Sequence, residues 1–176
     1  MKRAGEIQRQ ETALVEVRVQ HEARRAPAPP ASADSAATGV KAVRLYFAAA
    51  NGDSLVEEPR ELVEPANLHD KVVALVAELD RGPRGRGVSP LPAGTAVLHV
   101  YLDDRGLMTL DLSGAFRQGF RGGSTGEYMA IASLVRTLGA NVPEMKHLLI
   151  CCTGRPVSTL AGHLPLDQPL DVSDWP

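Results

Sequence analysis

Apolar residues recur along the chain with two different spacings, and these spacings predict strands and helices. The β-branched and aromatic run at 43–47 (VRLYF) predicts a strand, and the run at 60–64 (RELVE) predicts a shorter one after a turn. In residues 68–79 the apolar side chains follow the period of one helix face. Asn67 is a suitable N-cap for this helix, and Gly82-Pro83 is expected to end it.

The second half of the chain contains a hairpin, a helix and a strand. Residues 95–113 hold two alternating runs on either side of the turn 103–106, which predicts a β-hairpin. A helix is predicted over 124–139 and a buried strand over 147–152. The order strand, strand, helix, hairpin, helix, strand predicts an α+β fold, with a mixed or antiparallel sheet of about 3–5 strands and two helices packed on one face. The turn-rich residues after 152 are expected to run over the surface.

The chain is predicted to divide into a flexible N-terminal part and one folded domain. Residues 1–39 read as a charged stub and an Ala/Pro-rich tether, because the segment 22–38 has no large apolar side chain to bury. The segment 13–20 alternates apolar and polar residues, which fits either a short strand or part of the stub. Residues 40–174 are predicted to form the domain.

The stretch 120–139 (FRGGSTGEYMAIASLVRTLG) suggests either a phosphate-binding loop or the start of a helix. Ser124 and Glu127 have the S-x-x-E spacing of a capping box, an apolar face follows, and Gly139 fits a left-handed C-cap. The stretch lacks the lysine of a Walker loop, and its glycines miss the spacing of a nucleophile elbow. We therefore predict a structural cap, with an incidental anion contact at Arg121, Ser124 and Thr125 left open.

Other reactive side chains do not form a recognisable catalytic or metal-binding pattern. Cys151 and Cys152 are adjacent, and on a strand their thiols point to opposite faces, so we expect no disulfide between them. The histidines are scattered, with no zinc-pair spacing and no C-x-x-C motif. His99, within a predicted strand, is expected to face solvent. We predict no metal, no cofactor and no enzymatic activity.

Composition and charge narrow the possible partners. Apolar residues make up 44% of the 176-residue chain, enough for a core, and the net charge of −2 gives no reason to expect nucleic acid. No run approaches the roughly 18 apolar residues of a membrane span. The basic clusters at 81–87 and 121–123, with an element order similar to a KH domain, leave RNA binding as a weaker alternative.

Several landmarks in one order resemble the GerMN domain, the sporulation and spore germination module, over about residues 40–172. The residues that carry this resemblance are Leu45-Tyr46-Phe47 with Arg60, Gly82-Pro83, Pro92-Ala93-Gly94-Thr95, Asp111-Leu112-Ser113, Gly123-Ser124-Thr125-Gly126-Glu127 and Thr137-Leu138. The pair Cys151-Cys152 and the tail after Gly162 depart from the family pattern.

The resemblance implies a non-catalytic, extracytoplasmic interaction or scaffold module of the cell envelope, similar to ring-building motifs and normally held by a lipid or membrane anchor. We expect such an anchor ahead of this chain. The partners would be other envelope proteins or further copies of the chain, through an open sheet face or edge. The alternatives are an envelope hydrolase that uses Ser124 with His99 or His163, and a protein that binds a small ligand or cell-wall glycan. Trp175, the one tryptophan, lies at the extreme end of the chain, which speaks against glycan binding.

Overall fold

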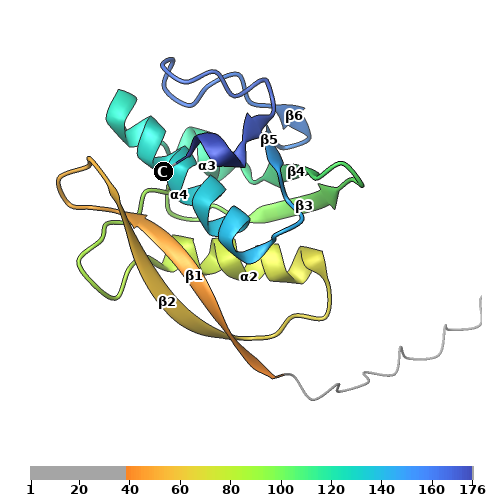
Figure 1. The fold of residues 1–176 in the computed structure, drawn as a ribbon. Helices are drawn as coiled ribbons and strands as arrows, with labels where there is room; N and C mark the ends of the chain where they lie inside the picture. Colours follow the sequence, from red (N-terminus) through yellow and green to blue (C-terminus); the bar gives the residue numbers. More distant parts are fainter. Residues whose placement is uncertain (1–38, 176) are drawn as a thin grey trace, which may run out of the picture. The chain divides into compact units, whose positions relative to one another are not determined.

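The computed structural model describes residues 39–175, and it begins with an antiparallel hairpin of two long strands. Strand β1 (Val40–Ala48) pairs with β2 (Leu55–Val63), and the two form a separate two-stranded sheet (Figure 1). The second strand is longer than predicted because pairing with β1 extends it back to Leu55. The predicted stub, the tether and the segment 13–20 lie outside the described residues.

The main sheet has five strands and is mixed, as predicted. Strands β3 (Val97–Leu102), β4 (Leu107–Leu112), β5 (His147–Cys152) and β6 (Arg155–Pro156) lie in that order, and β7 (Leu170–Asp171) also pairs with β5. The β3–β4 pair is the predicted hairpin, whereas β4 and β5 run parallel. Parallel neighbours require a long crossover, which the helical segment between them provides.

Three helices connect these strands. Helix α2 (Leu68–Arg81) begins at the predicted cap, since the Asn67 side chain accepts the Asp70 amide, and it ends before Gly82. The short α3 (Gly114–Gln118) follows β4, and α4 (Ser124–Asn141) crosses back to β5. The predicted C-cap at Gly139 is wrong: the helix continues past it. A side chain there would place its Cβ 2.7 Å from Val172 Cγ1, so the glycine allows close packing.

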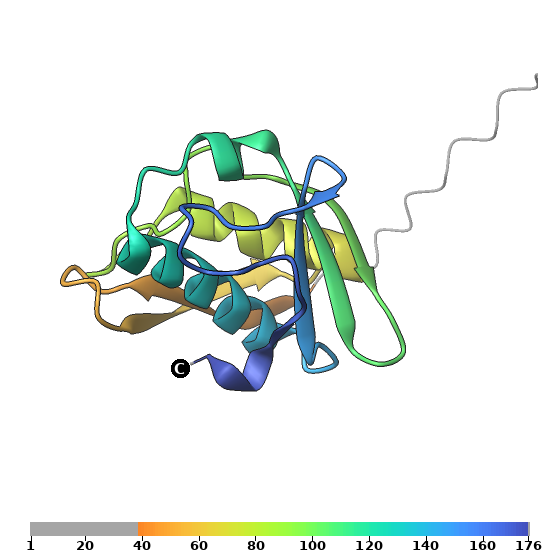
Figure 2. The same ribbon diagram turned by 90° about the horizontal axis from the view of Figure 1, so that it is seen from above.

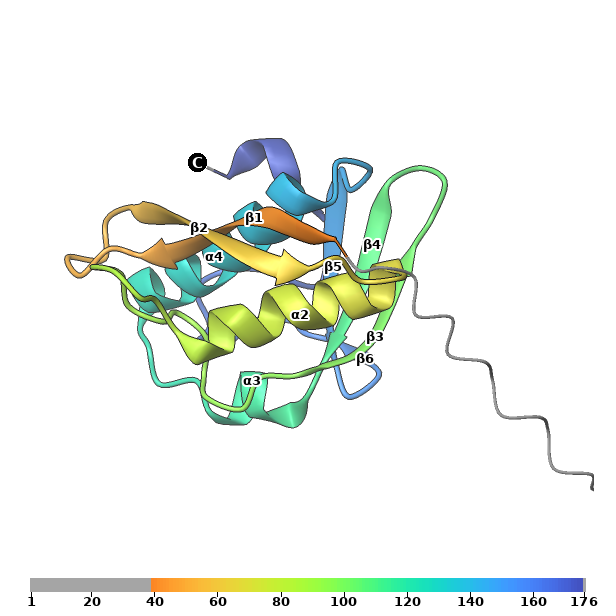
Figure 3. The same ribbon diagram turned by 90° about the horizontal axis from the view of Figure 1, so that it is seen from below.

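The hydrophobic core lies between the hairpin, the two long helices and the inner face of the main sheet. Both α2 and α4 contact β1, and α2 also contacts β3 (Figure 3). The prediction that α4 buries one face is only partly right, because apolar residues surround most of the helix. Tyr128, in the first turns of the helix, is 37% exposed.

The C-terminal residues return to α4, where the 3-10 helix η1 (Val172–Asp174) contacts it (Figure 2). Trp175 is buried as part of the core. The tail is therefore anchored at its end, although most of the predicted surface turns between β6 and β7 are exposed. Among residues 39–175, no helix combines the length and the hydrophobicity needed to span a bilayer.

Candidate functional site

The predicted capping box at the start of α4 is wrong. The N-cap residue is Gly123, no side chain caps the helix, and the Glu127 amide donates to the Gly123 carbonyl at 2.8 Å. Ser124 is exposed. The capping prediction fails because the Glu127 carboxylate is turned into the protein, where it meets several donors instead of one amide.

Glu127 binds the loop between β6 and β7. Its fully buried carboxylate accepts hydrogen bonds from the Thr159 hydroxyl and from the amides of Leu160 (2.8 Å), Ala161 (3.0 Å) and His163 (3.0 Å). Burial alone would raise the pKa of Glu127, but these donors outweigh it and lower the pKa to about 2. The carboxylate is therefore charged at neutral pH and anchors the loop.

The residues predicted for an anion contact are brought only partly together. Arg121 and Thr125 line an open, largely apolar cavity of about 340 Å³ beside the β1–β2 turn, and Ser124 is not part of its lining. The Arg121 guanidinium donates to the carbonyl oxygens of Gln118 (2.7 Å) and Phe120 (2.8 Å). These bonds hold Arg121 to its own loop, and the anion contact stays a prediction.

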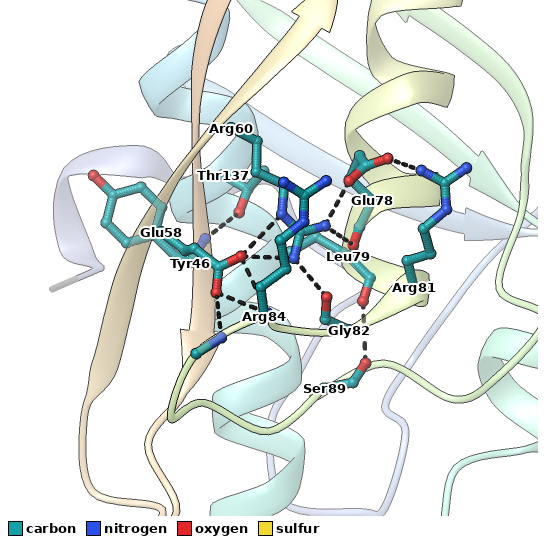
Figure 4. Close-up of polar contacts among 11 residues, drawn as sticks. Tyr46, Glu58, Arg60, Glu78, Leu79, Arg81, Gly82, Arg84, Ser89 and Thr137 are labelled. Atoms are coloured by element: carbon teal, nitrogen blue, oxygen red, sulfur yellow. Dashed lines mark hydrogen bonds and ion pairs between the residues drawn. The ribbon is translucent and has the colours of Figure 1, made fainter.

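A buried arginine joins β2 to the end of α2 (Figure 4). Arg60 is 4% exposed, and its guanidinium lies 5.3 Å from the centre of the Phe47 ring. It donates to Glu58 Oε1 (2.9 and 2.7 Å), Glu78 Oε2 (2.5 Å) and the Gly82 carbonyl (2.6 Å). With its charge paired and its donors bound, this arginine is a structural centre of the domain.

The same cluster holds the basic loop 81–87. Glu58 Oε2 accepts the amides of Arg84 (3.0 Å) and Gly85 (3.1 Å), so these two loop amides are already bonded to an internal carboxylate. Burial would raise the pKa of Glu58, but the Arg60 guanidinium and these amides lower it. The RNA-binding alternative would therefore depend on exposed arginine side chains alone.

The side chains proposed for hydrolysis are not connected by described contacts. Within residues 39–175, no hydrogen bond joins Ser124 Oγ to a histidine, and no cluster of three metal-binding side chains occurs. His99 is exposed, as predicted. His163 is exposed, and its amide donates to Glu127.

The two cysteines are free and occupy different environments, as predicted from their alternation along the strand. Cys151 is buried, and Cys152 donates to the Ser113 carbonyl at 3.3 Å. Burial and the nearby Asp111 charge raise the pKa of the Cys151 thiol, so it stays protonated and is a weak nucleophile.

The open edge of β1 is sealed by side chains of α4. Asn141 accepts the Arg44 amide (3.2 Å) and donates to the Arg44 carbonyl (2.7 Å), as a neighbouring strand would. Thr137 Oγ1 accepts the Tyr46 amide (3.0 Å), and the Ser133 hydroxyl donates to the Tyr46 carbonyl. These three polar residues recur every four positions along α4, a signal that could have been found in the sequence but was missed.

The outer edge of β2 is protected from pairing with another strand by its amino-acid composition. The register pairs three β1 residues with β2 residues: Arg44 with Pro59, Tyr46 with Glu57, and Ala42 with Glu61. Arg44 and Tyr46 turn their backbone groups toward α4. Their partners in β2 therefore face outward. Proline has no amide to offer, and the two glutamates repel a similar strand, so this edge resists pairing.

The edge of β3 has neither protection. The Asp103 amide donates to Leu107 in β4, and because pairing alternates, the backbone groups of Val100 and Leu102 point away from the sheet. None of the residues from 39 to 175 forms a side-chain hydrogen bond with these amide and carbonyl groups. Leu98 (39%) and Tyr101 (67%) add exposed apolar surface beside this edge.

The comparison with protein families identifies the class of this domain. Residues 44–158 match the model of the family described as "Sporulation and spore germination". The match covers more than half of the chain, and the chain therefore belongs to this family.

Solved structures share the fold. The first GerMN domain of the sporulation protein GerM from Bacillus subtilis is 18% identical, with a TM-score of 0.57 over 74% of this chain and 97% of that one. The tandem GerMN domains of GerM are 20% identical, with a TM-score of 0.57 over 80% of this chain and 48% of that one.

A candidate lipoprotein from Clostridium perfringens is also 20% identical, with a TM-score of 0.55 over 77% of this chain and 90% of that one. A search of the curated proteins finds no match. At these identities the structural likeness establishes the fold, while the family match establishes the membership.

Proposed function

We propose that this domain is a non-catalytic interaction module of the cell envelope that acts in sporulation or germination and self-associates through the edge of β3. The family description supports the process, and the name of the Clostridium perfringens protein supports a position outside the cytoplasmic membrane, next to an anchor. The observation that carries the proposal is the unprotected β3 edge, in a domain whose β1 and β2 edges are both blocked.

A second copy of the chain fits the β3 edge. Antiparallel pairing about a two-fold axis at Val100 would place Leu98 opposite Leu102 and His99 opposite Tyr101. β3 contains no acidic residue, lysine or arginine, so two copies would meet without like-charge repulsion. Such pairing would join the main sheets of two domains and satisfy the free backbone groups.

The test is the concentration dependence of the molar mass of the whole chain, measured by sedimentation equilibrium. We expect a reversible monomer–dimer equilibrium that is lost in the variant Leu98→Lys/Tyr101→Lys, because lysine on an edge strand opposes pairing. The matched control is Val40→Lys/Val63→Lys. It makes the same charge change at two exposed valines (64% and 59%) of the other sheet and should still dimerise.

Two results would refute self-association through β3. One is a native chain that remains monomeric up to its solubility limit. The other is an equal loss of dimer in both double-lysine variants, which would show that net charge and not the strand edge decides assembly. Capture of a different envelope protein that the β3 variant still binds would likewise move the contact surface elsewhere.

A further inference from the structure

A second cavity lies between the β1–β2 hairpin and helix α4. It has a volume of about 370 Å³ and is lined by Tyr46, Asp53, Ser54, Glu57, Tyr128 and Arg136, with Leu55 and Met129 at its apolar side. This volume falls at the small end of the ligand-pocket range of about 300–1,000 Å³. The cavity is separate from the β3 edge, so ligand binding in it does not depend on the proposed self-association.

An aromatic platform forms one wall of this cavity. The Tyr128 ring stacks on Trp175, with 5.1 Å between the ring centres and 27° between the planes. Trp175 is buried and does not line the cavity, so it supports Tyr128 from behind. Tyr128 itself is 37% exposed and lines the cavity. The terminal position of Trp175, which argued against glycan binding, is thus the position that braces this ring.

The polar groups of the cavity include an arginine without hydrogen-bond partners among the described residues. Arg136 Nε is buried and has no hydrogen-bond partner among residues 39–175, while the guanidinium lies 5.2 Å from the centre of the Tyr46 ring. The Tyr46 hydroxyl donates to Glu57 Oε2 at 2.7 Å. The Ser54 hydroxyl donates to Asp53 Oδ1 at 2.9 Å. These bonds leave the second carboxylate oxygen of Glu57 and of Asp53 to accept donors from a ligand.

We propose that this cavity binds a saccharide, with the apolar face of a sugar ring against Tyr128 and its polar groups shared between Arg136 and the carboxylates. Arg136 lines the cavity, and no side chain or backbone group among residues 39–175 accepts a hydrogen bond from its guanidinium, so its terminal nitrogens can donate to a ligand acceptor. An acetamido oxygen or a hydroxyl of an N-acetylhexosamine unit supplies such an acceptor, and its other hydroxyls supply donors.

The mixed charges favour a neutral, hydroxyl-rich ligand over an ion. A simple cation would be repelled by Arg136, and a simple anion would meet the carboxylates of Asp53 and Glu57. Sugar hydroxyls both donate and accept, so one molecule can pair with groups of either sign. Aromatic rings with one apolar face open are also suited to the C–H face of a sugar.

The test is a titration of the isotope-labelled whole chain with chitotetraose, the β-1,4-linked tetramer of N-acetylglucosamine, followed by amide chemical shifts. We expect saturable shifts at millimolar ligand, centred on Asp53, Tyr128 and Arg136. The variants Tyr128→Ala and Arg136→Met should each weaken binding by about tenfold or more, because each removes one of the main contacts. Tyr128→Phe keeps the ring and should bind within about twofold of the native chain.

A control variant and a second ligand test whether the sugar binds in this cavity. Tyr101→Ala removes an exposed aromatic ring on β3 and should leave the affinity for chitotetraose unchanged. Native-like binding in both Tyr128→Ala and Arg136→Met, with folding confirmed by their spectra, would overturn the proposal. So would shifts with a short Ala-Glu-Lys-Ala peptide and none with chitotetraose, since the cavity would then recognise peptide and not sugar.

Discussion

The two outer strands β1 and β3 differ in whether the backbone groups at their free edge are paired. Along β1, the amide and carbonyl groups of Arg44 and Tyr46 all receive side-chain partners from α4. Along β3, the equivalent groups of Val100 and Leu102 receive none from the described residues. A helix therefore replaces a neighbouring strand on one sheet, whereas the other sheet has an open edge, the one proposed above to pair with a second copy of the chain.

The difference follows from which edge is internal to the domain. The β1 edge faces α4 in the core, where unpaired backbone groups are unfavourable, and Tyr46 is 7% exposed. The β3 edge lies beside exposed side chains, so water can satisfy its backbone groups in a single copy of the chain. The contrast distinguishes an edge paired inside the domain from an edge that is left to solvent in a single copy.

The largest expected effect comes from removing the seal on β1. The triple variant Ser133→Ala/Thr137→Val/Asn141→Leu would lower the free energy of unfolding by about 3–5 kcal/mol, because it leaves the buried Tyr46 amide and carbonyl unpaired and removes two bonds to Arg44. Urea unfolding measured by circular dichroism gives this value.

A matched change on the other sheet provides the control for the seal. Thr109 in β4 is partly exposed, and no described residue forms a hydrogen bond with its hydroxyl. Thr109→Val should therefore shift the free energy of unfolding by no more than about 0.5 kcal/mol. If Thr137→Val alone is as mild as Thr109→Val, the seal does not contribute to stability as argued.

Helix α4 shows how far sequence reasoning reaches and where it stops. Apolar periodicity located the helix, and the turn residues located the β3–β4 hairpin, because both signals depend on neighbours in the chain. The roles of Glu127 and Gly139 were assigned wrongly, since their partners at 159–163 and at Val172 are distant in sequence. A capping box and a buried carboxylate clamp have the same local pattern.

The sequence predicted the type of interaction surface but not its location. An open sheet edge was expected, but the choice among β1, β2 and β3 needed the strand order and register. The cavity at Arg136 joins a hairpin turn, a helix and a supporting residue from the chain end, and no sequence spacing brings these together.

The second prediction uses pH to distinguish the contact of α4 with β1 from its contact with the 159–163 loop. The helix holds β1 through neutral groups but holds the 159–163 loop through the Glu127 carboxylate. The pKa of Glu127 is lowered from 4.5 to about 2, so its contribution is fully present above pH 4.5 and is lost as the pH falls through about 2. The shift corresponds to about 3 kcal/mol for this buried group.

Urea unfolding of the native chain and of Glu127→Gln, measured between about pH 7 and pH 3, tests this expectation. Glu127→Gln should be less stable by about 3 kcal/mol at neutral pH, and the difference should shrink on acidification. The triple variant at the β1 seal should instead show a deficit that does not depend on the Glu127 titration. A constant deficit in Glu127→Gln across this range would contradict the role given to its charge.

The smallest effect on stability is expected at β2, where protection of the edge depends on composition alone. Pro59→Val/Glu61→Thr would restore an amide and remove a charge at exposed positions, so the free energy of unfolding should change by less than about 1 kcal/mol. The edge would then resemble that of β3, and sedimentation should show a second mode of association. This association should persist when Leu98→Lys/Tyr101→Lys blocks β3, because the two edges belong to separate sheets. A chain with both changes that stays monomeric would mean that twist or local packing, and not proline and charge, keeps the β2 edge closed.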